Sequence, residues 1–183
     1  MRRLAILLPL LWLATCGSPP VQDHILAAIP PAHATATPGH PLRVGDVAIP
    51  PDLDRNELVT QASATALKVH RQDVWGAPLG GMIQRTLSAD LAARLGEGRV
   101  LAVDDPTSPS GTRTLTLSIR QFIAAPDGHV VLDADWTLQG HGAATSPHHA
   151  TMTTNADSGK PDAVVQAMSE ALAQLSDRIA RDL

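Results

Sequence analysis

The chain has 183 residues, of which 18 are acidic and 14 are basic, giving a formal net charge of −4 at pH 7. This length favours a single domain. The acidic balance, without a basic run, argues against a nucleic-acid partner. An aromatic content of 2% leaves few stacking platforms for bases or sugars.

The start of the chain has the pattern of a bacterial export signal. Two arginines follow Met1, and the next 11 residues, 4–14, are apolar. This stretch fits the apolar core of a secretory signal and is too short for a transmembrane helix, which needs roughly 20 apolar residues. Leu13-Ala14-Thr15 then precedes Cys16 and resembles the lipobox of bacterial lipoproteins. We therefore expect a signal peptide over 1–15 and a lipidated Cys16.

Cys16 is the only cysteine of the chain, so no internal disulfide can form. Acylation explains a lone cysteine at the end of a signal better than a free thiol does. The lipobox resemblance implies a diacylglyceryl group and an N-acyl chain such as palmitate, and two or more chains anchor a protein durably. Gly17 stands where an aspartate would retain a lipoprotein in the inner membrane. The expected location is therefore the periplasmic face of the outer membrane.

The mature chain is expected to begin with a tether. Residues 16–41 are rich in proline, alanine, threonine and histidine, and they show no periodicity. This composition predicts an extended segment, within which a short strand around Asp23–Ala27 is conceivable. One folded domain is expected over 42–183. Its first half is predicted to contain strands at Leu42–Ile49, Leu58–Gln61, Leu67–His70 and Val100–Val103.

Two helices are predicted by apolar residues that recur every three or four positions. The first begins near Pro78 and ends at Gly96, and its stripe is Leu79, Ile83, Leu87, Leu91 and Leu95. The second runs from about Pro161 to Ala180, and its stripe is Val165, Met168, Leu172, Leu175 and Ile179.

Strict alternation of apolar and polar residues predicts an antiparallel hairpin between these helices. Its strands cover 115–119 and 130–138, and a third strand is expected over Thr151–Ala156. Trp136 falls on the buried face. The predicted fold class is α+β, with two amphipathic helices packed on an antiparallel sheet of about four to five strands.

The sequence contains no motif of a hydrolase, a nucleotide-binding protein or a metalloprotease, so we expect neither an enzyme nor a cofactor. A predicted loop over 140–149 contains His141, His148 and His149, which could bind a metal or could be a merely polar loop. Asp133 and Asp135 share the wet face of a strand, where a solvated surface or a protein contact is the simplest interpretation.

Several stretches, taken together, resemble a known family. They are RNELV at 55–59, HRQDVW at 70–75 with the following APL, VVLDADWTL at 130–138, and the terminal helix. In this order and spacing they look like the ABC-type transport auxiliary lipoproteins of the PqiC (YmbA) type. That family often has a Tyr-Tyr-x-Leu strand after the cysteine, where this chain has Asp-His-Ile-Leu at 23–26.

The resemblance implies a non-enzymatic accessory subunit of an intermembrane lipid-transport system that supports outer-membrane integrity. Its implied partners are a protein with mammalian-cell-entry (MCE) domains and ABC permease components, and the resemblance is compatible with a homo-oligomeric ring. Among the residues themselves, an alternative stays open: a periplasmic ligand- or metal-binding lipoprotein.

Overall fold

The computed structural model describes residues 20–32, 38–96, 98–140, 146–157 and 159–183. The predicted signal peptide and Cys16 lie outside these residues. No helix of the described ranges is both long enough and apolar enough to cross a membrane.

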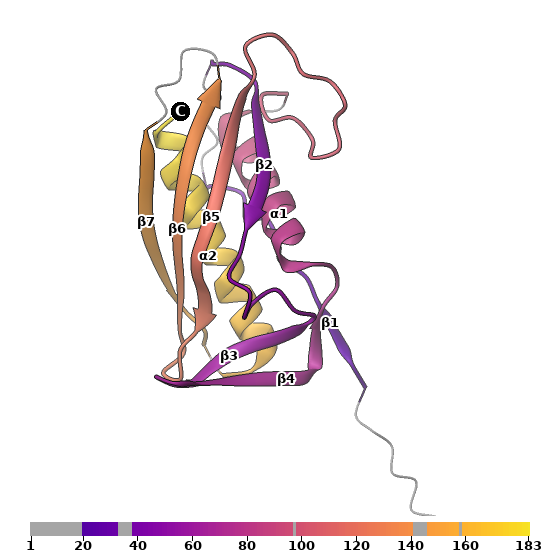
Figure 1. Cartoon of the computed structure of the whole chain (residues 1–183), viewed down its shortest axis with the longest axis vertical. Coiled ribbons are helices and arrows are strands. Elements are labelled where there is room, and N and C mark those ends of the chain that lie inside the picture. The colour runs from indigo at the N-terminus through magenta and orange to yellow at the C-terminus, as the bar shows by residue number, and fades with distance from the viewer. Residues whose placement is uncertain (1–19, 33–37, 97, 141–145, 158) are drawn as a thin grey trace, which may run out of the picture.

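The strands form two sheets, drawn in Figure 1. Sheet A has the order β1 (Gln22–His24), β4 (Ala66–Trp75), β3 (Glu57–Ser63). Sheet B has the order β2 (Leu42–Ala48), β5 (Arg113–Ala124), β6 (His129–Gly140), β7 (Pro147–Asn155). The helices are α1 (Leu79–Leu95) and α2 (Pro161–Arg181). The predicted α+β class is confirmed.

The arrangement of the strands differs from the single antiparallel sheet that was predicted. β1 pairs with β4 in parallel, and β2 pairs with β5 in parallel. A parallel pair requires a crossover connection, and between β2 and β5 the chain forms β3, β4 and α1. Each sheet thus combines parallel and antiparallel pairing. Alternation within a strand indicates which face is buried, but it does not indicate a pairing partner so far along the chain.

The core lies between sheet B and the two helices, which pack on one face of that sheet. The predicted stripes are buried: Leu87, Leu91 and Leu172 are each 0% exposed. Trp136 is 1% exposed and confirms the predicted inward face of β6. α1 is buried beyond its leucine stripe, because Asp90 and Arg94 are also covered.

Residues 20–32, which composition assigned to the tether, include part of the folded domain. β1 forms within them, and Leu26 is 7% exposed. Their proline content does predict an extended chain, but an extended chain can also pair with a strand edge, and β4 offers one here. Two other predicted bounds are also wrong. Val100 makes a single bridge to Leu42 instead of starting a strand, and β7 begins at Pro147.

Sheet A crosses the end of the molecule opposite the C-terminus, and sheet B runs away from it toward that terminus. The first described residues, just before β1, lie at the sheet A end. A lipid anchor preceding β1 would therefore hold the molecule by this end.

Candidate functional site

The segment that follows the predicted anchor is the first candidate site. Val21 is the fifth residue after Cys16, and a fully extended chain of five residue steps spans at most about 18 Å. The contacts that hold the segment after Val21 would therefore transmit the pull of an anchor to the domain.

His24 joins β1 to two other elements. Its Nε2 lies 3.0 Å from Asp73 Oδ1 on β4, and its Nδ1 lies 3.4 Å from Asp162 Oδ1 in the first turn of α2. The His24 side chain is 6% exposed. Both ring nitrogens thus face a carboxylate. β1 has only three residues, so its strand pairing alone contributes little stability. The His24 imidazole holds it to β4 on one side and to α2 on the other.

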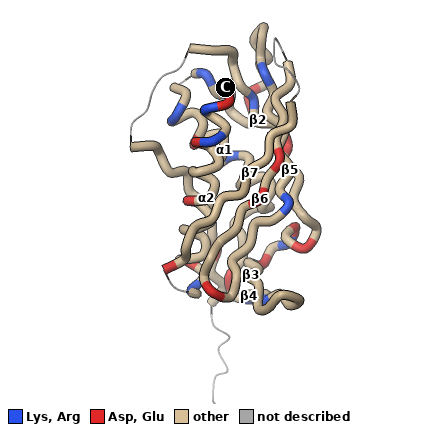
Figure 2. Tube along the Cα trace, turned by 90° about the vertical axis from the view of Figure 1, so that its left-hand side faces the viewer, with Lys and Arg blue, Asp and Glu red and all other residues tan. Residues whose placement is uncertain are grey.

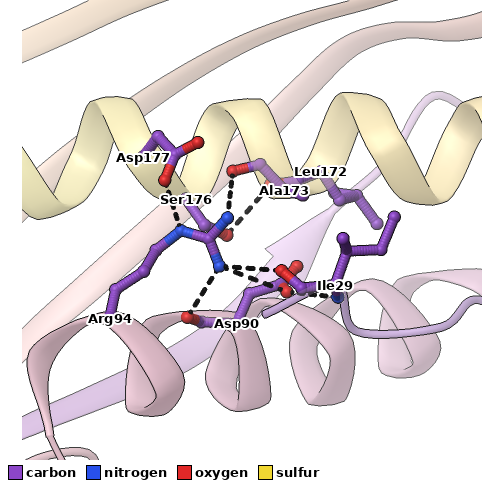
Figure 3. A network of polar contacts seen from close by, with 7 residues as sticks. All are labelled: Ile29, Asp90, Arg94, Leu172, Ala173, Ser176 and Asp177. Carbon is purple, nitrogen blue, oxygen red and sulfur yellow. Dashed lines mark hydrogen bonds and ion pairs between the residues drawn. The ribbon is translucent and has the colours of Figure 1, made fainter. Parts of the chain in front are cut away.

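Beyond β1 the chain crosses the two helices and binds polar side chains of both. The Ala27 N–H donates to Ser169 Oγ of α2 at 3.1 Å. The Ile29 N–H donates to Asp90 Oδ1 of α1 at 2.7 Å (Figure 3). Arg94 Nη1 donates to the Ile29 carbonyl at 3.1 Å. We call Asp90, Arg94, Ser169 and Asp177 the clasp.

Arg94 is the centre of the clasp. Its Nε donates to Asp177 Oδ1 at 2.6 Å, and its Nη2 donates to the Ala173 carbonyl at 3.1 Å, so one side chain of α1 binds α2 twice. Its Nη1 also reaches Asp90 Oδ1, one turn earlier on α1, at 3.4 Å. The guanidinium presents donors in a fixed planar fork, and here it links three separate segments.

Asp90 has an unusual environment for a carboxyl group. It is 0% exposed, and burial raises its pKa to about 6, against the lowering effects of the Ile29 N–H and Arg94. Its second oxygen, Oδ2, has no hydrogen-bond partner among the described residues. Removing one member of a buried ion pair costs several kcal/mol, because the other is left unpaired. We therefore expect that other polar residues could not replace the members of the clasp without a loss of stability.

The sequence pattern does not predict the clasp. The leucine stripe of α1 includes neither Asp90 nor Arg94. The one available signal was their i,i+4 spacing, which places an acid and a base on the same helix face. Their backbone partner Ile29 lies 61 residues before Asp90 in the chain, in a segment that composition assigned to the tether.

The uncovered face of sheet B is the second candidate site. Asp133 and Asp135 share this face, as predicted, and His149 of β7 approaches both: its Nδ1 lies 3.1 Å from Asp135 Oδ1 and 3.5 Å from Asp133 Oδ1. A hydrogen bond from Arg120 lowers the pKa of Asp135. Most of the sheet B trace carries no charge (Figure 2). The hydroxyl side chains of Thr116, Ser118 and Thr137 share this face with the ion pairs. Such a face suits a polar protein contact.

The histidines predicted to share a loop are separated. His148 and His149 are consecutive residues of β7 and point to opposite faces of it. His148 stacks on Trp136 with ring centroids 5.4 Å apart, and its Nδ1 lies 3.2 Å from Asp182 Oδ2. His141 lies outside the described residues. Within the described ranges, no three His, Cys, Asp or Glu side chains are placed to hold a metal ion.

Two shallow grooves flank Ile25. The one toward α1 encloses about 350 Å³ and is lined mainly by Leu26, Ala77, Met82 and Arg85. The one toward α2 encloses about 400 Å³ and includes Asp162 and Val165. Both are open to solvent beside the segment that follows the predicted anchor. His24 and Ser169 both line the groove toward α2, but the Ser169 hydroxyl donates to the Val165 carbonyl at 2.9 Å and both His24 ring nitrogens face carboxylates.

Comparisons with known proteins give the family and the fold. The family described as "ABC-type transport auxiliary lipoprotein component" matches residues 24–180. The intermembrane transport lipoprotein PqiC of Escherichia coli is 28% identical over 148 residues, which are 78% of this chain and 76% of PqiC. The protein of the same name from Shigella flexneri gives the same values.

Two crystal structures share the fold. One, of an uncharacterised protein, is 24% identical, with a TM-score of 0.76 over 90% of this chain and 99% of that one. The other, from Xanthomonas campestris, is 16% identical, with a TM-score of 0.63 over 86% of this chain and 92% of that one. The family is one of transport components and is not an enzyme family. The match begins at His24, the last residue of β1, and extends through α1 and all but the last residue of α2. The resemblance seen in the sequence is confirmed: this chain belongs to the ABC-type transport auxiliary lipoprotein family.

Proposed function

We propose that this protein is a lipid-anchored subunit of an intermembrane lipid-transport system, held through Cys16 on the periplasmic face of the outer membrane. Family membership over 24–180 carries the proposal. The lipobox and Gly17 supply the anchor and its membrane. The similarity to PqiC, whose name is that of an intermembrane transport lipoprotein, supports the transport role.

The partners in this proposal are an MCE-domain protein and the ABC permease components of the same system. The uncovered face of sheet B is the surface we assign to a protein partner, because it is broad and polar and carries the ion pair of Arg120 with Asp135 among hydroxyl side chains. A homo-oligomeric ring would present several copies of this face to a partner of matching symmetry.

Loss of the gene tests this function. The deletion strain should become sensitive to detergents and large antibiotics that an intact outer membrane excludes, and the wild-type chain should restore resistance. A Cys16→Ser chain should be exported, remain in the soluble periplasmic fraction and fail to restore resistance. Full barrier function without the gene, or with the Cys16→Ser chain, would contradict the proposal.

A further inference from the structure

The large hydrophobic side chains that are exposed in the described part of the chain gather at the sheet A end. They are Val21, 61% exposed, Ile25, 68% exposed, and Leu67, 45% exposed. Val21 and Ile25 stand immediately before and after β1, and Leu67 is the second residue of β4. Scattered single apolar residues need no explanation, but these three share one end of the molecule, the end at which the first described residues lie.

The three side chains are widely spaced across that end. β1 pairs with the last residues of β4, with His24 opposite Trp75, so Ile25 lies beside the end of β4. Leu67 lies eight residues before Trp75, which corresponds to about 26 Å along a strand. Contacts at three positions with this separation would fix the orientation of sheet A against a flat surface. A single patch would leave the domain free to tilt.

The short covalent link to the predicted anchor indicates what this surface contacts. Cys16 lies at most about 18 Å of extended chain before Val21. Its acyl chains hold the domain at a high effective concentration beside one leaflet, so a contact that is weak alone is sufficient to orient it. The clasp and His24 fix Ile25 to both helices, so the position of this side chain is rigid relative to the domain.

We propose that sheet A lies on the leaflet that holds the anchor, with Val21, Ile25 and Leu67 in the lipid headgroup region. Arg71 of β4 is exposed on the same sheet and suits a lipid phosphate, whereas Asp23 is the exposed acid of β1. Lys68 alternates to the face opposite Leu67 and lines a groove with Ala124 and Val164. This inference rests on the proposed anchoring through Cys16. Sheet B then runs away from the membrane and presents its polar face and the C-terminal end to the periplasm.

Site-directed fluorescence on the full lipoprotein tests this orientation. Cys16 is the only cysteine and its thiol is consumed by acylation, so a second cysteine takes a single thiol-reactive NBD label. The test variants are Ile25→Cys and Leu67→Cys. The matched controls are Thr116→Cys on the uncovered face of sheet B and Ala102→Cys in the exposed loop after α1. Each protein is reconstituted into vesicles of phosphatidylethanolamine and phosphatidylglycerol, with or without lipids spin-labelled near the headgroup.

The labels at positions 25 and 67 should shift to the blue in vesicles and lose emission to the spin-labelled lipids, while those at 102 and 116 should keep their emission. A label at 67 that is no more quenched than the one at 102 would overturn the proposal. So would a blue shift at 25 and 67 in lipid-free solution, because a second copy or another protein would then cover the surface. Protein that does not float with the vesicles would refute the anchoring itself, and a floating protein with unquenched labels would refute only the orientation.

Discussion

Replacing Asp90 by asparagine removes the buried charge of the clasp and keeps an oxygen for the Ile29 N–H. The carboxyl has a pKa of about 6 in the folded protein, against 3.8 as its ordinary value. Between these values the folded state binds more protons than the unfolded state, so the free energy of unfolding falls as the pH rises. The stabilisation is complete below the unfolded pKa and is lost as the pH rises through the folded pKa.

The size of this loss follows from the pKa difference. A difference of about 2.2 units corresponds to about 3 kcal/mol. Asparagine does not titrate, so the Asp90→Asn chain lacks this loss. The stability of the variant minus that of the wild type should therefore rise by most of this amount, about 2 kcal/mol, from about pH 4 to about pH 7. Any constant cost of the buried amide leaves the slope unchanged.

Urea unfolding followed by the fluorescence of Trp75 and Trp136 measures this slope. Asp105→Asn, in the loop after α1, is the matched control, because hydrogen bonds from Thr107 lower the pKa of Asp105 below its ordinary value. The control should therefore keep the wild-type pH dependence. A difference between Asp90→Asn and the wild type that is constant with pH would show that Asp90 is not buried under the Ile29 segment, and the clasp would be wrong.

Three further substitutions probe the rest of the fold. Leu172→Ala removes a fully buried side chain of α2 and should cost about 2–5 kcal/mol in urea unfolding; a cost near zero would contradict the assigned core. Gly140→Ala should destabilise by about 1–3 kcal/mol, since residue 140 has φ 117° and its Cβ would lie 2.6 Å from the Thr112 carbonyl; an unchanged Tm would contradict the β6 end as built. His24→Ala should release β1, so the amide of Gly76, which donates to the His24 carbonyl at 2.9 Å, should exchange hydrogen faster while that of Leu117 keeps its rate; equal protection of Gly76 in both proteins would refute the role of His24.

Local periodicity carried most of the secondary structure. The leucine stripe over 79–95 and the alternation over 130–138 predict α1 and β6 within a residue or two, because each pattern reflects a single buried face. Trp136 was assigned to the core for the same reason. The C-terminal helix extends to Arg181, one residue beyond the predicted end.

Long-range contacts could not be read in the same way. The parallel pair of β2 and β5 and the division into two sheets depend on partners separated by several elements. The clasp is also a long-range contact. The leucine stripe predicts α1 without Asp90 and Arg94, and their partner Ile29 lies in a segment whose prolines and alanines show no periodicity. Composition identified that segment as extended, but it could not show that α1 and α2 bind it.

We propose that this chain works as an anchored subunit of a lipid-transport assembly. The most direct test of this role is isolation of the tagged, lipidated protein from crosslinked envelopes of its own host, followed by mass spectrometry, with the Cys16→Ser chain as the control. We expect an MCE-domain protein and a permease to be recovered with the wild-type chain and to be depleted with the control. Recovery of the lipoprotein from the membrane with no transport component, under conditions that capture a known envelope complex, would contradict it.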